Sequence, residues 1–355
     1  MRLGVEAAIV EGVLVPGDLA IEDGHVVAVG LEGGGSGTAV PGFVDLQVNG
    51  FGGVDFAAAD EDGYRRAGAA LLETGVTAFQ PTLITAPEHD LVASLAQVPR
   101  GRIGPRVLGV HLEGPFLAPA QMGAHPLHAR HDPDLALAQR LLAGGQVGYM
   151  TLAPELDGAL ELIDFLHACG VVVSCGHSDA TAAEAAAAFD RGVRTVTHLF
   201  NAMRPFDHRD PGIAGAALAR DDVVVQAILD GVHLAGATER VIWKAAAGRL
   251  ALVTDAIGGT RLGNDDVVID SGVARRADGT LAGSVVTMPE CVRNLRTLGA
   301  TLEQAVAAAT SVPARVLGRD DIGVLRVGGP ADVVVLDDRL EVRSVHVDGR
   351  EEVAA

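Results

Sequence analysis

The chain is short of cysteine, aromatic residues and cations, and each shortage excludes a class of protein. Its 355 residues include 3 cysteines, an odd number without a C-x-x-C pair, so free thiols in a reducing compartment are predicted. Lys and Arg total 27 against 46 Asp and Glu, a net charge of −19. Nucleic acid and anionic membrane both require a basic face, so neither is expected as a partner.

Long apolar runs are also missing. No stretch approaches the roughly 20 residues of a membrane helix, and the start "MRLGVEAAIVEG" lacks a signal-peptide pattern. Aromatic residues make up only 3%, so the 48% of hydrophobic residues predict a core built mainly of Ala, Val and Leu. A soluble, cytoplasmic protein is predicted.

Short β-rich runs alternate with alanine-rich stretches along most of the chain. The predicted strands are residues 43–48, 76–80, 106–112, 147–152, 171–175, 194–199, 223–229 and 250–254. Helices are expected between them: 62–75 with Asp62 as N-cap, and 179–192 beginning at Asp179. Eight strands alternating with helices predict an α/β fold of the (β/α)8 TIM-barrel type. An open doubly wound sheet is the alternative, weakened because no G-x-G-x-x-G follows the first strand.

The two ends of the chain have a different character. Residues 1–40 and 320–355 read as strands and turns without helical periodicity, which predicts one small β-sandwich domain built from both termini. The barrel then covers 41–319. Residues 263–284, with "RADGT" as a turn, predict a hairpin insertion, and the helical region 301–318 is expected to break at Pro313.

Chemically useful side chains follow several of the predicted strands. Because the carboxyl ends of barrel strands meet at one mouth, Glu113, His177 and His198 are expected to converge there. One carboxylate and two imidazoles form a ligand set for Zn²⁺ or Fe²⁺. A single strand-end histidine is more often a hydrogen-bonded core residue, and Asp255 after the eighth strand is equally a helix N-cap or a general base. His111, two residues before Glu113, is predicted to be packed and hydrogen-bonded.

Several motifs together resemble one family. "PGFVDLQVNGFGG", "HLEGPFL", "GHSDAT", "HLFNAM", "DGVHL", "LVTDAI" and the tail "GGPADVVVLD" occur in that order. The chain resembles, over essentially its whole length, the N-acetylglucosamine-6-phosphate deacetylase family of the metal-dependent amidohydrolase superfamily. The resemblance implies the barrel with its terminal β-domain, and hydrolysis of the N-acetyl group to acetate and glucosamine 6-phosphate.

The resemblance also implies roles for individual residues at the reaction centre. Glu113, His177 and His198 would hold one divalent ion per subunit, Zn²⁺ or Fe²⁺, which lowers the pKa of a water. Asp255 would act as general base and then as acid, and His125 would stabilise the oxyanion.

The resemblance implies a phosphate site as well. His233 would bind the phosphate, with Asn201 and Ala202 hydrogen-bonding the phosphate or sugar. Arg209 would reach the neighbouring site across a homodimer.

Two carboxamides stand where most of the superfamily has a His-x-His pair. Gln47 and Asn49 lie on one face of the first predicted strand. Carboxamides are poor ligands for Zn²⁺ or Fe²⁺, so a single-metal site is expected. Their expected role at the substrate site is hydrogen bonding to neighbours or water, and a weak second ion stays open.

Two other functions are alternatives. Another mononuclear amidohydrolase, such as a deaminase or an N-acyl amino acid hydrolase, would not need phosphate contacts from His233 and Arg209. A non-catalytic barrel scaffold would have no reason to keep the complete set of Glu, His, His and Asp.

Overall fold

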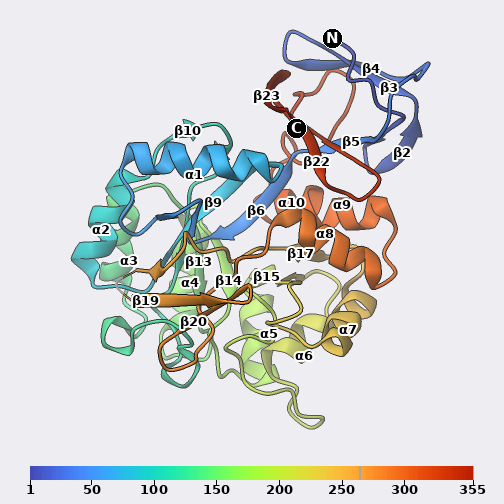
Figure 1. The fold of residues 1–355 in the computed structure, drawn as a ribbon. Helices are drawn as coiled ribbons and strands as arrows, with labels where there is room; N and C mark the ends of the chain where they lie inside the picture. The colour runs from blue at the N-terminus through green and yellow to red at the C-terminus, as the bar shows by residue number, and fades with distance from the viewer. Residues whose placement is uncertain (264, 355) are drawn as a thin grey trace.

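A run of parallel strands forms the main body of the molecule (Figure 1). The computed structural model describes residues 1–263 and 265–354. Asn264, within the expected hairpin segment, and Ala355, at the end of the expected terminal β segment, lie outside these residues. The eight parallel strands are β6 (Phe43–Val48), β9 (Val76–Ile84), β12 (Val110–Glu113), β13 (Val147–Leu152), β14 (Val172–Cys175), β15 (Thr195–Val196), β16 (Val224–Ala227) and β17 (Leu250–Leu252). Each pairs in parallel with the next along this order.

The first and last of these strands meet only beyond the end of β17. An isolated parallel bridge joins Val48 to Ala256. The Asp255 N–H donates to Gln47 O at 2.9 Å, and the Asn49 N–H to Ala256 O at 2.7 Å. The described strands therefore form a sheet whose two edges are tied at the carboxyl ends, without a continuous β6–β17 ladder.

Helices follow the strands and cover the sheet (Figure 1). They are α1 (Glu61–Glu73), α2 (Glu88–Gln97), α3 (Leu135–Gly144), α4 (Ala159–Ala168), α5 (Ala182–Asp190), α6 (Gly212–Leu218), α7 (Gly236–Ala246), α8 (Met288–Thr297), α9 (Leu302–Ala309) and α10 (Ser311–Val316). Short 3₁₀ turns, η1 (Pro119–Gln121) and η2 (Leu127–Ala129), lie between β12 and α3.

Both predicted N-caps were wrong by two residues. Asp60, not Asp62, caps α1 by accepting from the Gly63 N–H. Thr181, not Asp179, caps α5, in a reciprocal pairing with Glu184. In each case the N-cap side chain accepts a hydrogen bond from the backbone N–H three residues later, which has no partner within the helix.

Several other predicted boundaries also shift. The strand expected at 106–112 is two strands, β11 (Arg106–Val107) and β12, interrupted at Gly109, whose φ of +88° turns the chain. β9 extends to Ile84. The closing helical region breaks at Thr310, not at Pro313, because a proline in the first turn of α10 removes an N–H that has no partner within the helix.

Strands from the two termini share a second sheet (Figure 1). Its order is β2 (Val13–Pro16), β1 (Ala7–Val10), β5 (Thr38–Pro41), β21 (Val333–Leu336), β22 (Val342–Val347) and β23 (Arg350–Ala354). A hairpin of β3 (Asp18–Glu22) and β4 (His25–Leu31) adds Leu19, Ile21 and Val26 to a core distinct from that of the main sheet. The domain boundaries near 40 and 320 stay a prediction.

The hairpin predicted at 263–284 is present as the antiparallel strands β19 (Asp265–Asp270) and β20 (Val273–Arg276). A short strand just before the predicted segment, β18 (Arg261–Leu262), adds a third antiparallel strand. The "RADGT" turn lies after β20 and sends the chain back past it, with an Arg275–Leu281 bridge. Smaller pairs are β7 (Gly50–Phe51) with β8 (Val54–Asp55), and β10 (Gly101–Arg102) with β11. Among the described residues, no helix has the length and apolar character needed to cross a membrane.

Candidate metal and catalytic site

The predicted reactive side chains lie at the carboxyl ends of the parallel strands. Glu113 is the last residue of β12, whereas His177 and His198 each follow their strand by two residues. His177, His198 and Asp255 have φ values of 48°, 29° and 51°. Such a backbone costs about 1–3 kcal/mol per residue and persists only where surrounding contacts impose it. The fold therefore maintains strain at three of the predicted functional positions.

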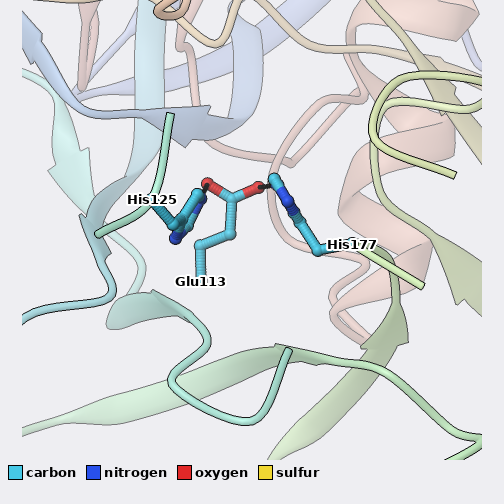
Figure 2. A group of neighbouring side chains, drawn as sticks. All are labelled: Glu113, His125 and His177. Carbon is cyan, nitrogen blue, oxygen red and sulfur yellow. Dashed lines mark hydrogen bonds and ion pairs between the residues drawn. The ribbon is translucent and has the colours of Figure 1, made fainter. Parts of the chain in front are cut away.

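The Glu113 carboxylate is the centre of the site (Figure 2). Its Oε1 lies 2.8 Å from His198 Nε2 and 3.2 Å from His177 Nε2, and these two nitrogens are 3.1 Å apart. On the other side, Oε2 lies 3.4 Å from His125 Nε2. The structure thus brings together the three predicted ligands and the predicted oxyanion donor, all buried.

The charges of this cluster are strongly coupled. Burial disfavours the Glu113 carboxylate, but contacts with His125, His177 and His198 outweigh burial and lower its pKa. Burial lowers the pKa of His125 to about 4, so this imidazole is neutral at pH 7. For His198, burial again opposes the charged form, and the neighbouring Glu113 carboxylate raises the pKa.

The hydrogen bond at Nδ1 of His177 indicates whether its Nε2, which lies beside Glu113, is available as a metal ligand. His177 Nδ1 lies 2.8 Å from Gln121 O, a carbonyl that only accepts, so Nδ1 carries a proton. In the neutral form of the ring, this leaves a lone pair on Nε2, the nitrogen 3.2 Å from Glu113 Oε1, and a cation between these two atoms would satisfy both. Glu113, His125 and His177 also have ligand atoms within 4.8 Å of one another. This N/O donor set fits a divalent metal ion.

Asp255 lies beside this cluster with a raised pKa. Burial and the negative charge of Glu113 raise the pKa of Asp255 to about 6. Asn49 Nδ2 donates to Asp255 Oδ1 at 2.7 Å. A carboxylate that titrates near neutral pH beside a metal site can both take and return a proton.

The two carboxamides that replace His-x-His donate hydrogen bonds to the site's carboxylates. Gln47 Nε2 donates to Glu113 Oε1 at 2.9 Å, as Asn49 does to Asp255. The remaining amide oxygens, Gln47 Oε1 and Asn49 Oδ1, are buried and have no protein partner among the described residues. Both residues thus orient the carboxylates of Glu113 and Asp255.

A cavity of about 320 Å³ opens over the cluster. His233, Asn201 and Ala202 line it, whereas Arg209 is exposed on the loop before α6 and does not. His233 Nδ1 lies 2.8 Å from Asp230 Oδ2, so the carboxylate of Asp230 holds this imidazole. Asn201 Nδ2 donates to the carbonyls of His198 and Leu199.

Sequence reasoning missed Asp230, which contacts His233, and several residues that line the cavity. Asp230 lies within the quoted "DGVHL" motif, and its spacing of three from His233 was an available signal. Thr280, Leu281 and Gly283 line the cavity from the insertion after β17, and Ile84 lines it from the end of β9. No local pattern marks these four residues, because only the folded chain brings the insertion over the strand ends.

Comparison with known proteins first defines the class. A model of the amidohydrolase family matches residues 38–351, so the chain belongs to the amidohydrolase family.

Individual relatives then narrow the comparison. The chain is 41% identical to N-acetylglucosamine-6-phosphate deacetylase of Bos taurus, over 95% of this chain and 88% of that protein. It is 34% identical to N-acetylgalactosamine-6-phosphate deacetylase of Escherichia coli, over 96% of each chain. The crystal structure of the N-acetyl-D-glucosamine-6-phosphate deacetylase from Mycobacterium smegmatis matches with a TM-score of 0.92 and 39% identity, over 99% of this chain and 100% of that one. The Thermotoga maritima N-acetylglucosamine-6-phosphate deacetylase matches with a TM-score of 0.90 and 30% identity, over the full length of both chains.

Proposed function

We propose that this protein hydrolyses the N-acetyl group of N-acetylglucosamine 6-phosphate to give glucosamine 6-phosphate and acetate. The observation that carries the proposal is the buried Glu113 carboxylate in contact with His125, His177 and His198, with Asp255 in the same cavity. The relatives named for this activity, which match nearly the whole chain, support the substrate.

Glu113, His177 and His198 are the residues assigned to the metal, which is Zn²⁺ or Fe²⁺. When bound, such an ion makes water a nucleophile near neutral pH and polarises a carbonyl oxygen. The lone pair of His177 Nε2, which results from the Gln121 contact, supports the role of His177 as a ligand. Gln47 and Asn49 keep the two carboxylates in place, and we assign no second ion to them.

His125 differs from the two ligand histidines. The Thr85 backbone N–H points at His125 Nδ1 at 3.3 Å, and Thr85 Oγ1 lies 3.0 Å from the same nitrogen. A donor at Nδ1 leaves the ring proton on Nε2, the nitrogen 3.4 Å from Glu113 Oε2, and His125 lines the cavity. His125 can therefore donate a hydrogen bond to the acetyl oxygen as negative charge develops there.

Asp255 accepts the proton of the attacking water and returns it to the sugar nitrogen as the C–N bond breaks. Its pKa of about 6 suits both transfers near neutral pH.

The phosphate end of the substrate is assigned to His233 with Asn201 and Ala202. The cavity position of all three and the Asp230 contact with His233 support this assignment. Arg209 is assigned to the site of a second subunit in a homodimer, which agrees with its exposure on a loop away from its own cavity. The bridge and hydrogen bonds between β6 and the residues after β17 support closure of the eight strands into a (β/α)8 barrel.

The test is acetate release from N-acetylglucosamine 6-phosphate, compared with the unphosphorylated sugar and with metal content assayed on the same sample. We expect about one Zn²⁺ or Fe²⁺ per chain and a marked preference for the phosphorylated sugar. N-acetylgalactosamine 6-phosphate belongs in the same assay, because the Escherichia coli relative is named for it. Equal rates with and without phosphate would favour another amidohydrolase activity.

A further inference from the structure

A second cavity lies next to the catalytic one. Its volume is about 760 Å³, against about 320 Å³ for the catalytic cavity. Much of its lining is apolar and comes from the end of β9, from α2 and from η2, including Leu83, Ala86, Pro87, Leu91 and Leu127. Arg276 and Asp265 also line it, and Arg276 Nη2 is paired with Asp265 Oδ2 at 2.9 Å. This second cavity therefore suits an apolar group better than an anion.

Three residues line both cavities: Ile84, His125 and Leu262. Ile84 and Leu262 belong to one small core cluster, together with Ile257, Val267, Ala274 and Ala282. A Cβ placed on Gly263 would lie 3.6 Å from Ile84 Cδ1, which shows how closely β18 approaches the end of β9. Ile84 is 8% exposed and Leu262 6%, so both are packed as a wall between the two spaces.

The wall and the proposed phosphate end are separate parts of the catalytic cavity. Ile84 ends β9, whereas His233 follows β16, and these two strands are not neighbours in the sheet. The carbonyl carbon of an N-acyl sugar has the nitrogen on one side and the acyl chain on the other. With the sugar and its phosphate towards His233 and the carbonyl oxygen at His125, the acyl chain is directed towards Ile84 and Leu262.

We propose that Ile84 and Leu262 limit the N-acyl group to about the size of acetyl, and that the cavity behind them receives longer, unbranched acyl chains once the wall is opened. This inference rests on the proposed function. The reaction is unchanged: water adds its oxygen to the acyl carbon, the C–N bond breaks, and the amine leaves with a proton. One methylene in a hydrophobic pocket changes kcat/KM by about 10–200-fold, so the wall is expected to act mainly on acyl length.

The test measures glucosamine 6-phosphate release from its N-acetyl, N-propionyl, N-butyryl and N-hexanoyl derivatives. For the wild type, kcat/KM should fall at least about 100-fold from acetyl to butyryl. Ile84→Ala and Leu262→Ala should each raise the butyryl-to-acetyl ratio at least about tenfold. Ile84→Val serves as a milder variant with a smaller shift in the same direction, should the alanine variants fail to fold.

Val267→Ala is the matched control. Val267 belongs to the same cluster and is 3% exposed, but it is not among the residues that line either cavity. Its butyryl-to-acetyl ratio should stay within about twofold of the wild type. An unchanged butyryl-to-acetyl ratio in the Ile84 and Leu262 variants, with acetate release retained, would contradict the proposal that these residues limit acyl size. A wild type that cleaves the butyryl and acetyl derivatives equally well would contradict it too. A wild type that releases no acetate from N-acetylglucosamine 6-phosphate would instead refute the proposed function.

Discussion

Two buried polar clusters that contain histidine lie at different depths among the parallel strands, and their hydrogen bonds differ. In the deeper one, His111 has a partner at each ring nitrogen: Thr82 Oγ1 at 3.2 Å and Thr151 Oγ1 at 2.8 Å. Burial lowers the pKa of His111 to about 4, so this ring is neutral. Thr151 Oγ1 continues to Thr197 Oγ1 at 2.8 Å. The deeper cluster satisfies its own polar groups.

At the strand ends, in contrast, imidazoles converge on one carboxylate and on each other. His177 and His198 present their Nε2 atoms 3.1 Å apart beside Glu113. His198 Nδ1 is buried with no partner within the described part of the chain. Buried polar groups that have all their hydrogen-bond partners within the protein stabilise the fold. Buried imidazoles and a carboxylate that point at one another, with a ring nitrogen left without a partner, are instead typical of a site that binds an ion. The following experiments test this difference.

Removal of the central carboxylate should have the largest effect. Glu113→Gln keeps the side-chain shape but removes the charge that opposes a divalent cation. Bound Zn²⁺ or Fe²⁺ should fall from about one per chain to below about a tenth, and deacetylation should fall to the level of the metal-free protein. Metal analysis and acetate release check both. Glu161→Gln, exposed on α4, is the control and should change neither. Full metal content in Glu113→Gln would remove Glu113 from the ligand set.

Loss of the proposed general base should follow in size. Asp255→Asn keeps a partner for Asn49 but cannot accept the proton of water. We expect kcat to fall about 10²–10⁴-fold with metal content unchanged. Steady-state kinetics and metal analysis on one preparation measure kcat and the metal content. A decrease smaller than about tenfold would assign the proton transfer to another group.

The pH dependence of kcat/KM should also depend on Asp255. Asp255 is active as a base only when ionised, and burial together with Glu113 raises its pKa to about 6. As pH falls through this value, kcat/KM should therefore decrease, approaching tenfold per pH unit; a bound cation moves the midpoint below 6. A pH profile of kcat/KM measures the midpoint. The residual activity of Asp255→Asn should lack this acidic limb, and its persistence would exclude Asp255 as its source.

A change in the deeper cluster should affect activity least. Thr151→Val leaves His111 Nε2 without its partner and interrupts the contact with Thr197. The free energy of unfolding should fall by about 1–3 kcal/mol, with metal content unchanged and kcat/KM within about threefold. Urea unfolding and the acetate assay measure the two effects. Thr297→Val, on the exposed end of α8, should leave stability unaltered within about 0.5 kcal/mol. Loss of metal in Thr151→Val would mean that the two clusters act as one unit.

Hydrophobic periodicity located the eight strands and the helices that were named, although several of their boundaries shift. β6 and β13 have the predicted bounds, because continuous apolar runs between turn residues are a local signal. Boundaries failed where short-range hydrogen bonds decide them, as at Asp60, Thr181 and Thr310. The quoted motifs also contain the three predicted metal ligands and Asp255, since each of these residues lies at or close to the end of a predicted strand.

The sequence by itself therefore determined the alternation of strands and helices, the family, and which imidazoles and carboxylates are available to the site. Only the tertiary structure decided which of them touch, which ring nitrogens carry lone pairs, that Asp230 holds His233, and that Ile84 and Leu262 separate two cavities. The physical reason is distance along the chain: Glu113 and His198 are 85 positions apart and Asn49 and Asp255 are 206 apart. Contacts of that separation depend on how the strands pack, which no local pattern encodes.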